Sequence, residues 1–118
     1  MSPSDKPLHI VLNAVRTDKA DDWEEFTRSE LVPLVKKQRP ELLERVRLLR
    51  STESGDEVTM FAFLFEGGDL DDYDLKPLFA AEFGEDEGQN RLQPWIDMFT
   101  KDQEGWSFHS TNLFQSRK

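Results

Sequence analysis

The sequence predicts an α+β protein with the element order β-α-β-β-α-β, whose four strands form one antiparallel sheet with the helices on a single face. Three observations support this prediction. The run Val58–Phe65 carries no charge, although 33% of the 118 residues are charged. Apolar residues recur at helical spacing in two regions, and each region lies between two strand patterns. Right-handed β-α-β crossovers then place the first and third strands in the middle of the sheet.

The third strand, Val58–Phe65, is apolar on both of its faces. Side chains alternate along a strand, so the run divides into two sets of residues. One set is Val58, Met60, Ala62 and Leu64, and the other is Thr59, Phe61, Phe63 and Phe65. A strand with one face in water would alternate apolar with polar residues. Both faces must therefore be covered, one by the helices and the other by a partner subunit, a ligand or both. The pattern leaves open which set faces the helices.

The first half of the chain divides into a strand, a helix and a second strand. Leu8–Val15 has a clean apolar face and is typical of a central strand. Asp21, with a glutamate three residues later, predicts the N-cap and capping box of a helix that Pro33 kinks and Pro40 ends. Leu43–Arg50 predicts an edge strand, because its arginines discourage pairing with another sheet.

The second half of the chain predicts a linker, two helical pieces and a last strand. The expected ranges are Asp69–Asp74 for the acidic linker, Leu75–Phe83 and Glu85–Phe99 for the helical pieces, and Trp106–Phe114 for the strand. Glycines mark the joints, because Gly67 and Gly68 favour a turn and Gly84 suits a helix C-terminus. The linker lacks the glycine and the closing glutamate of a calcium loop, so we interpret it as a solvated segment.

The composition argues against several classes of function. There are 24 acidic and 15 basic residues, a net charge of −9, which disfavours nucleic acid and anionic membranes as partners. No apolar segment is long enough to span a bilayer. Cysteine is absent, which excludes disulfides and thiolate chemistry, and no spacing of residues fits a metal site. We expect a cytoplasmic protein with a single domain at residues 8–114, a disordered tail at 1–7 and a polar tail at 115–118.

The order of elements, the length and the open sheet face resemble the dimeric α/β-barrel superfamily. This superfamily, whose topology is ferredoxin-like, includes antibiotic-biosynthesis monooxygenases, stress-responsive barrel proteins and polyketide cyclases. The segments Leu12–Arg16 and Asp21–Phe26 are similar to the start of the monooxygenase family. The resemblance implies a homodimer that presses two open sheet faces together, and it implies that Asn13 is a polar group inside a pocket. No histidine lies in the second helical region, where haem-degrading relatives carry their iron ligand, so no cofactor is expected.

The candidate catalytic residues are His109, Asn13 and His9. His109 falls in the last predicted strand and is the best candidate for proton transfer, because imidazole gains and loses a proton near neutral pH. His9 and Asn13 share a strand face roughly 13 Å apart and could contact the two ends of an elongated substrate. The alternatives are structural: a histidine satisfied in the core or at the surface, and an asparagine that hydrogen-bonds another strand or the dimer partner.

Five aromatic residues are candidates for holding a substrate ring: Phe61, Phe63, Tyr73, Trp95 and Trp106. The two tryptophans are large enough to line an aromatic pocket, and Tyr73 could place its hydroxyl over the pocket mouth. The alternative is that both tryptophans are ordinary core residues and that the ring of Tyr73 packs on a neighbouring strand.

These observations predict a small cofactor-independent enzyme that acts on an apolar aromatic or polyketide-like molecule. The expected reaction is an oxygenation, or a cyclisation or isomerisation by acid/base groups. The alternative is a non-catalytic dimer, a stress-related or pathway-accessory protein that binds a small molecule. A cavity that brings Asn13 and a histidine together would favour the enzyme, because folds of this kind host unrelated functions and only the site decides.

Overall fold

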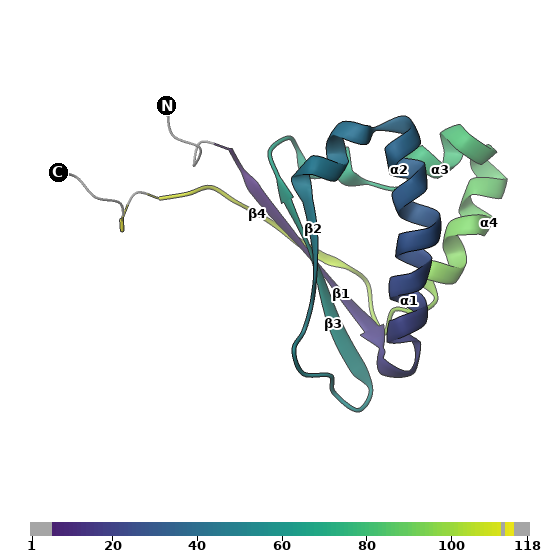
Figure 1. Ribbon diagram of the computed structural model, residues 1–118, viewed down its shortest axis with the longest axis horizontal. Helices are drawn as coiled ribbons and strands as arrows, with labels where there is room; N and C mark the ends of the chain where they lie inside the picture. The colour runs from purple at the N-terminus through teal and green to yellow at the C-terminus, as the bar shows by residue number, and fades with distance from the viewer. Residues whose placement is uncertain (1–5, 112, 115–118) are drawn as a thin grey trace.

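The computed structural model describes residues 6–111 and 113–114 and has the predicted order of strands and helices. Its strands are β1 (Leu8–Arg16), β2 (Val46–Arg50), β3 (Val58–Glu66) and β4 (Glu104–Phe108). They form one antiparallel sheet in the order β2-β3-β1-β4 (Figure 1). The α+β class, the edge position of the second strand and the central position of the first and third strands are confirmed.

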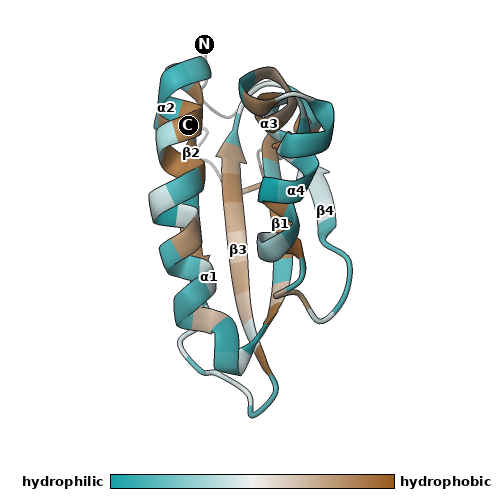
Figure 2. Cartoon of the chain, turned by 90° about the vertical axis from the view of Figure 1, so that its right-hand side faces the viewer, coloured by the Kyte–Doolittle hydropathy of each residue, from teal (hydrophilic) through white to brown (hydrophobic). Residues whose placement is uncertain are grey.

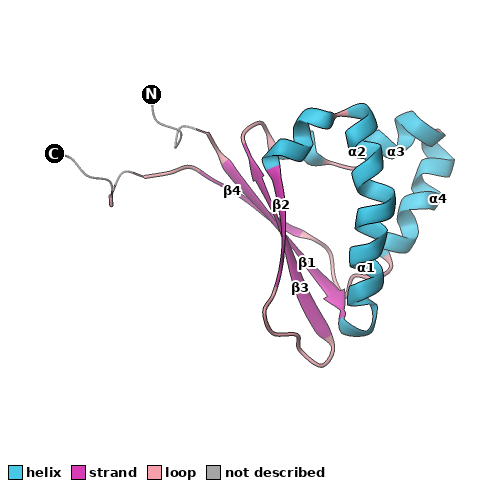
Figure 3. Cartoon of the chain, in the orientation of Figure 1, coloured by secondary structure: helices cyan, strands magenta, loops and turns pink. Residues whose placement is uncertain are grey.

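The α-helices lie together on one side of the sheet. They are α1 (Ala20–Phe26), α2 (Val32–Gln38), α3 (Lys76–Phe83) and α4 (Glu85–Ile96). Figure 3 shows the magenta sheet on one side of the molecule and the cyan helices on the other. Within the described residues, no helix is long and apolar enough to cross a membrane. The second face of the sheet has no cover from the described part of the chain.

The aromatic set of β3 faces the helices. Phe61 and Phe65 are buried, and the ring of Phe61 lies 4.4 Å from the ring of Trp23 in α1, measured between centroids. The alternate residues are only half-buried and lie on the open face: Val58, Met60, Ala62 and Leu64. In Figure 2 the apolar strand β3 runs beneath the helices, between α1 and α4. The question that the two-faced pattern left open is thereby answered.

An aromatic cluster forms the centre of the core between the sheet and the helices. Trp23 is fully buried there, and its ring stacks on that of Trp95 in α4 at 5.3 Å between centroids. The ring of Phe99 lies edge-on to Trp95 at 5.0 Å. Aromatic side chains bury more area than other residues, so this cluster carries a large share of the folding energy.

The first helical region is not one helix kinked at Pro33. A π-helical segment, Thr27–Leu31, separates α1 from α2. Proline has no backbone N–H, and its ring crowds the carbonyl four residues back, so a wider turn just before it removes the conflict. The predicted N-cap is also wrong, because the helix begins at Ala20 without a side-chain cap, and Asp21 instead accepts a hydrogen bond from Arg50 at 3.0 Å.

Two strand boundaries also differ from the prediction. The second strand begins at Val46 because Pro40–Arg45 form a 3-10 helix, for which the fixed φ of proline is well suited. The last strand is Glu104–Phe108 rather than Trp106–Phe114. Phe108 pairs with Leu8, which is the first residue of β1, so the chain beyond it has no strand left to pair with.

The connecting segments hold more structure than the sequence suggested. The acidic linker contains a 3-10 turn, Leu70–Tyr73, closed by a capping box between Asp69 and Asp72. Of the predicted tails, residues 1–5 and 115–118 lie outside the described residues. Pro7 is described, and its carbonyl accepts a hydrogen bond of 2.8 Å from the N–H of Gly67. This bond ties the start of β1 to the turn that follows β3.

Helices α3 and α4 approach closely at Gly88. A Cβ atom at this position would lie 2.7 Å from the backbone carbon and oxygen of Phe79. We expect Gly88→Ala to lower the free energy of unfolding by about 1–3 kcal/mol, because backbone atoms cannot move aside as a side chain can. Urea unfolding measures the change. Asn90→Ala, at an exposed position of the same helix, is the matched control and should stay within about 0.5 kcal/mol of the unmodified protein.

Candidate functional site

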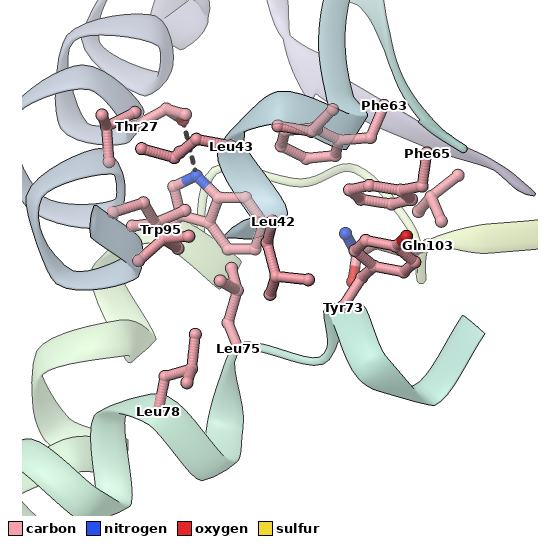
Figure 4. A pocket seen from close by; sticks show the side chains of 15 residues that line it. Thr27, Leu42, Leu43, Phe63, Phe65, Tyr73, Leu75, Leu78, Trp95 and Gln103 are labelled. Atoms are coloured by element: carbon pink, nitrogen blue, oxygen red, sulfur yellow. Dashed lines mark hydrogen bonds between the residues drawn. The ribbon is translucent and has the colours of Figure 1, made fainter. Parts of the chain in front are cut away.

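An apolar cavity of about 120 Å³ lies between the helices and the sheet (Figure 4). The sheet contributes Val11, Phe63 and Phe65, the helices contribute Thr27, Leu31, Val35, Leu78 and Trp95, and the connecting segments contribute Leu42, Leu43, Tyr73, Leu75 and Gln103. Val32 and Val46 complete the wall toward the surface. Almost all of this wall is carbon. Such a space suits an apolar ligand and repels an ionised one, because burying an unpaired charge is costly.

Stacked aromatic rings form one wall of the apolar cavity. Phe63 and Phe65 lie on the helix side of β3, and their rings stack at 5.7 Å between centroids. Tyr73 continues the row, stacked on Phe65 at 4.1 Å. Alternation along β3 supplies the first two rings, and the 3-10 turn in the acidic linker supplies the third. The row offers a flat apolar surface to a ligand ring.

Thr27 and Trp95 form the facing wall. The hydroxyl of Thr27 donates to the carbonyl of Trp23 at 2.8 Å and accepts from the indole N–H of Trp95 at 3.0 Å. Both polar groups are therefore occupied, and the indole ring of Trp95 is held in place. Thr27 opens the π-helical segment, so the unusual turn in the first helical region shapes this wall.

Tyr73 and His9 fasten the turn at one end of the apolar cavity. The hydroxyl of Tyr73 donates to the carbonyl of Gly67 at 2.6 Å, and Nε2 of His9 donates to the carbonyl of Gly68 at 2.8 Å. Both glycines have a positive φ, 87° and 68°, which favours glycine at each position. Nδ1 of His9 bonds the hydroxyl of Ser107 at 2.7 Å. His9 is thus buried with both ring nitrogens occupied, and it is not on the cavity wall.

Asn13 reaches the apolar cavity only through Gln103. Its side chain is fully buried, and Nδ2 donates to the carbonyls of Val11 at 3.2 Å and Phe61 at 3.3 Å. Its Oδ1 accepts a hydrogen bond of 2.6 Å from Nε2 of Gln103. The two backbone carbonyls fix the orientation of the Asn13 amide, so Gln103 has to donate. Gln103 is the residue of this pair that lines the cavity.

The predicted site residues fall in three places. Phe63, Tyr73 and Trp95 line the apolar cavity together. Phe61 lies in the core beneath Trp23, away from the wall. The other two lie outside the cavity: Trp106 on the open sheet face, 48% exposed, and His109 in an exposed segment after β4. The described chain therefore brings neither histidine onto the cavity wall.

Several lining residues escaped the sequence analysis. Leu42 and Leu43 lie in the 3-10 helix Pro40–Arg45, and the predicted second strand began only at Leu43. Gln103 precedes β4, which was expected to begin later, at Trp106. Phe65 was assigned correctly to the aromatic set of β3 but was not proposed for the site. The pairing of Glu104 with Leu12 would have placed Gln103 beside Asn13, but this register depends on where β4 begins.

A second hollow of about 380 Å³ lies outside the apolar cavity, and we call it the outer hollow. The two spaces share the lining residues Thr27, Val32, Leu43, Val46 and Phe63. The outer hollow adds Glu24, Arg28 and Leu48. It therefore adjoins the apolar cavity, between the first helical region and the edge strand β2.

The two charged residues that line the outer hollow, Glu24 and Arg28, belong to a group of ion pairs. Arg28 pairs with Glu24, at 3.6 Å, and with Glu25. On the other side of Glu24, Arg50 of β2 contacts it at 2.9 Å and Asp21 at 3.0 Å. These hydrogen bonds, first to Asp21 and then to Glu24, raise the pKa of the Arg50 guanidinium above its ordinary value. The charges at the mouth are thus engaged with one another.

Comparison with known proteins identifies a fold but no family. No protein-family model matches the chain, and no curated protein matches it. Among the solved structures that are similar over nearly the whole chain, three illustrate the likeness. A NIPSNAP family protein from Agrobacterium tumefaciens is 12% identical with a TM-score of 0.61. The alignment covers 95% of this chain and 99% of that one. A proposed antibiotic biosynthesis monooxygenase from Nitrosomonas europaea is 16% identical with a TM-score of 0.53. This alignment covers 96% of this chain and 95% of that one.

The third similar structure is a dimeric protein of unknown function from Bacteroides fragilis, described as having a ferredoxin-like fold. It is 14% identical with a TM-score of 0.52, and the alignment covers 90% of this chain and 97% of that one. These likenesses confirm that the chain has the ferredoxin-like α+β fold expected from its sequence. At such low sequence identities the similar structures establish the fold alone, and the function has to be inferred from the site.

Proposed function

We propose that this protein binds an apolar molecule of about the size of one aromatic ring in the apolar cavity. The observation that carries the proposal is the almost wholly apolar wall, with the stacked rings of Phe63, Phe65 and Tyr73 on one side and Trp95 on the other. Cavities of this character bind apolar ligands: an engineered one of about 150 Å³ in another protein takes up benzene. The volume of about 120 Å³ fits one ring and is too small for a fused-ring polyketide.

Catalysis on such a ligand is the second candidate function, either cofactor-independent oxygenation or an acid/base cyclisation or isomerisation. Two amide side chains favour it, because Gln103 and Asn13 could together orient a ligand oxygen at the end of the cavity. The likeness to a proposed monooxygenase is compatible with it. A role for His109 in proton transfer would need a second copy of the chain to complete the site. Oxygen uptake detects the oxygenation and chromatography of the recovered ligand detects a cyclisation or isomerisation, since binding alone consumes no oxygen and leaves the ligand unchanged.

We further propose that the protein is a homodimer whose subunits cover each other's open sheet faces. The centre of that face is apolar, and its apolar residues are Leu8, Ile10, Leu12 and Ala14 of β1, Leu49 of β2, the half-buried set of β3, and Trp106 and Phe108 of β4. Two charged residues, Arg47 of β2 and Glu104 of β4, lie at its edges. Trp106 and Phe108 are 48% and 49% exposed. Monomeric proteins rarely expose so large a continuous apolar patch. The protein from Bacteroides fragilis with the same fold is described as dimeric, which supports the proposal of a dimer.

The binding proposal predicts that toluene stabilises the folded protein. A ligand that binds only the native state raises the free energy of unfolding, by about 2.7 kcal/mol at a free concentration of about 100 Kd. We expect a saturable rise in melting temperature, measured by differential scanning calorimetry. In Val35→Phe the added ring enters the cavity, so the rise should disappear.

Val58→Phe is the matched control for this experiment, because Val58 is also half-buried but lies on the opposite face of the sheet. This variant should keep the response to toluene. The same melting temperature with and without toluene in the unmodified protein would contradict the binding proposal. So would an unchanged response in a folded Val35→Phe protein.

A further inference from the structure

The apolar cavity and the outer hollow form one path from the interior to the surface. Their shared residues come from two sides, Thr27 and Val32 from the first helical region and Leu43 and Val46 from the segment that leads into β2. The side chains of these four residues line the passage between the two spaces. Val32 is 40% exposed, and exposed side chains change rotamer within nanoseconds, so the passage can open without movement of the backbone.

The two parts of this path differ in chemistry. The inner part is lined by carbon and gives a charged group nothing to bind. The outer part has polar side chains, Glu24 and Arg28, at its rim. A molecule that occupies both parts must therefore be apolar at one end and polar at the other.

The charges at the rim indicate what kind of polar end the path accepts. Arg28 is held by Glu24 and Glu25, and Arg50 by Glu24 and Asp21, so both cations already have carboxylate partners. The five groups sum to −1, from two positive and three negative charges. The whole chain carries a net charge of −9, which also repels anions. A carboxylate would compete with these ion pairs, whereas a hydroxyl can hydrogen-bond to a rim carboxylate without disturbing them.

We infer that the ligand is an uncharged amphiphile, such as an alkylphenol or an alkanol, with its alkyl end in the cavity and its hydroxyl-bearing end in the outer hollow. This inference rests on the proposed binding function and names the class of ligand. It also assigns the passage between α2 and β2, at Val32, as the route by which the ligand enters. Glu24 and Arg28 are the groups that meet its polar end.

Titration calorimetry with matched ligands tests the class. From 4-ethylphenol to 4-butylphenol, we expect each added methylene to strengthen binding about fourfold, as apolar burial dictates. At pH 7, 4-butylbenzoate should bind at least about tenfold more weakly than 4-butylphenol, because it carries a carboxylate in place of the hydroxyl. A benzoate that binds as tightly as the phenol would overturn the inference.

A bulky substitution tests the route. Val32→Trp should slow the association of 4-butylphenol about tenfold in stopped-flow fluorescence. Lys36→Trp adds the same side chain one turn along α2, outside both hollows, and should not slow it. Equal rates in the two folded variants would overturn the route. If toluene binds but a longer alkyl chain does not increase the affinity, the inference about the ligand class fails while the proposed binding function stands. If no ligand binds at all, both fail.

Discussion

Trp23→Ala is expected to lower the free energy of unfolding by about 3–5 kcal/mol, which is a large part of the stability of a domain of this size. Trp23 has no exposed surface, and its ring contacts those of Phe61 and Trp95 at 4.4 and 5.3 Å between centroids. Its removal leaves a void in the centre of the aromatic cluster that the sheet and helices cannot close. Equilibrium unfolding in urea measures the loss.

Trp106→Ala is the matched control, since it removes the same side chain from the opposite face of the sheet. Trp106 is 48% exposed in the single chain, so its loss should change the stability of a subunit by less than about 1 kcal/mol. Its effect should instead appear as a weaker dimer. The comparison is made at a protein concentration where the subunits are dissociated. If the two substitutions then lower the free energy of unfolding by the same amount, the assignment of the two sheet faces is wrong.

If the subunits pair as proposed, Ala62→Asp is expected to convert the proposed dimer to a monomer. Ala62 lies in the middle of the open face, where it pairs with Leu12 of β1 and Leu49 of β2. A carboxylate buried between two apolar faces would have no partner, and the penalty of several kcal/mol exceeds what a dimer interface tolerates. Sedimentation velocity should show a species of half the mass of the unmodified protein.

Thr52→Asp adds the same charge in the exposed segment between β2 and β3 and should leave the dimer intact. Circular dichroism of Ala62→Asp should keep the helical signal, because the helices lie on the other side of the sheet. A dimeric Ala62→Asp protein would show that the subunits meet through another surface. An unmodified protein that sediments as a monomer at tens of micromolar would refute the dimer itself.

The alternation of residues in Val58–Phe65 predicted a central strand correctly because local geometry decides it. Which face turns to the helices could not be predicted, since both faces are apolar and the choice depends on distant partners. The orientation of the strand is set by packing, because the ring of Trp23 contacts Phe61 and the ring of Trp95 contacts Phe63. A local pattern therefore predicts the strand, and contacts across the chain decide its orientation.

The errors in element boundaries have the same origin. The end of β4 at Phe108 follows from the start of β1 at Leu8, ninety or more positions away in the sequence, as expected for pairing between distant strands. The π-helical segment before Pro33 reflects a proline that the helix accommodates rather than a simple kink. The end of β4 has no signal within its own stretch of sequence, whereas Pro33 signals a disturbed helix without specifying its form.

The lining of the apolar cavity was predictable where the size of an aromatic ring was enough, and it was unpredictable for polar residues. Phe63, Tyr73 and Trp95 were proposed as large rings near a pocket, and they line the cavity. His9 and Asn13 were proposed for their chemistry. In the structure their polar atoms bond to groups far along the chain, Gly68 for His9 and Gln103 for Asn13. Sequence alone does not distinguish such structural bonds from contacts to a ligand.

The chain contains three tryptophans, and their indole N–H signals in a nitrogen-15 NMR spectrum report on three different places. Trp95 lines the apolar cavity, Trp23 lies in the core beside it, and Trp106 lies on the open sheet face. Titration with toluene tests the proposed binding site directly. The signal of Trp95 should shift and saturate while that of Trp106 stays in place. No shift in the Trp95 signal, or a saturable shift of Trp106 alone, would contradict binding in the cavity.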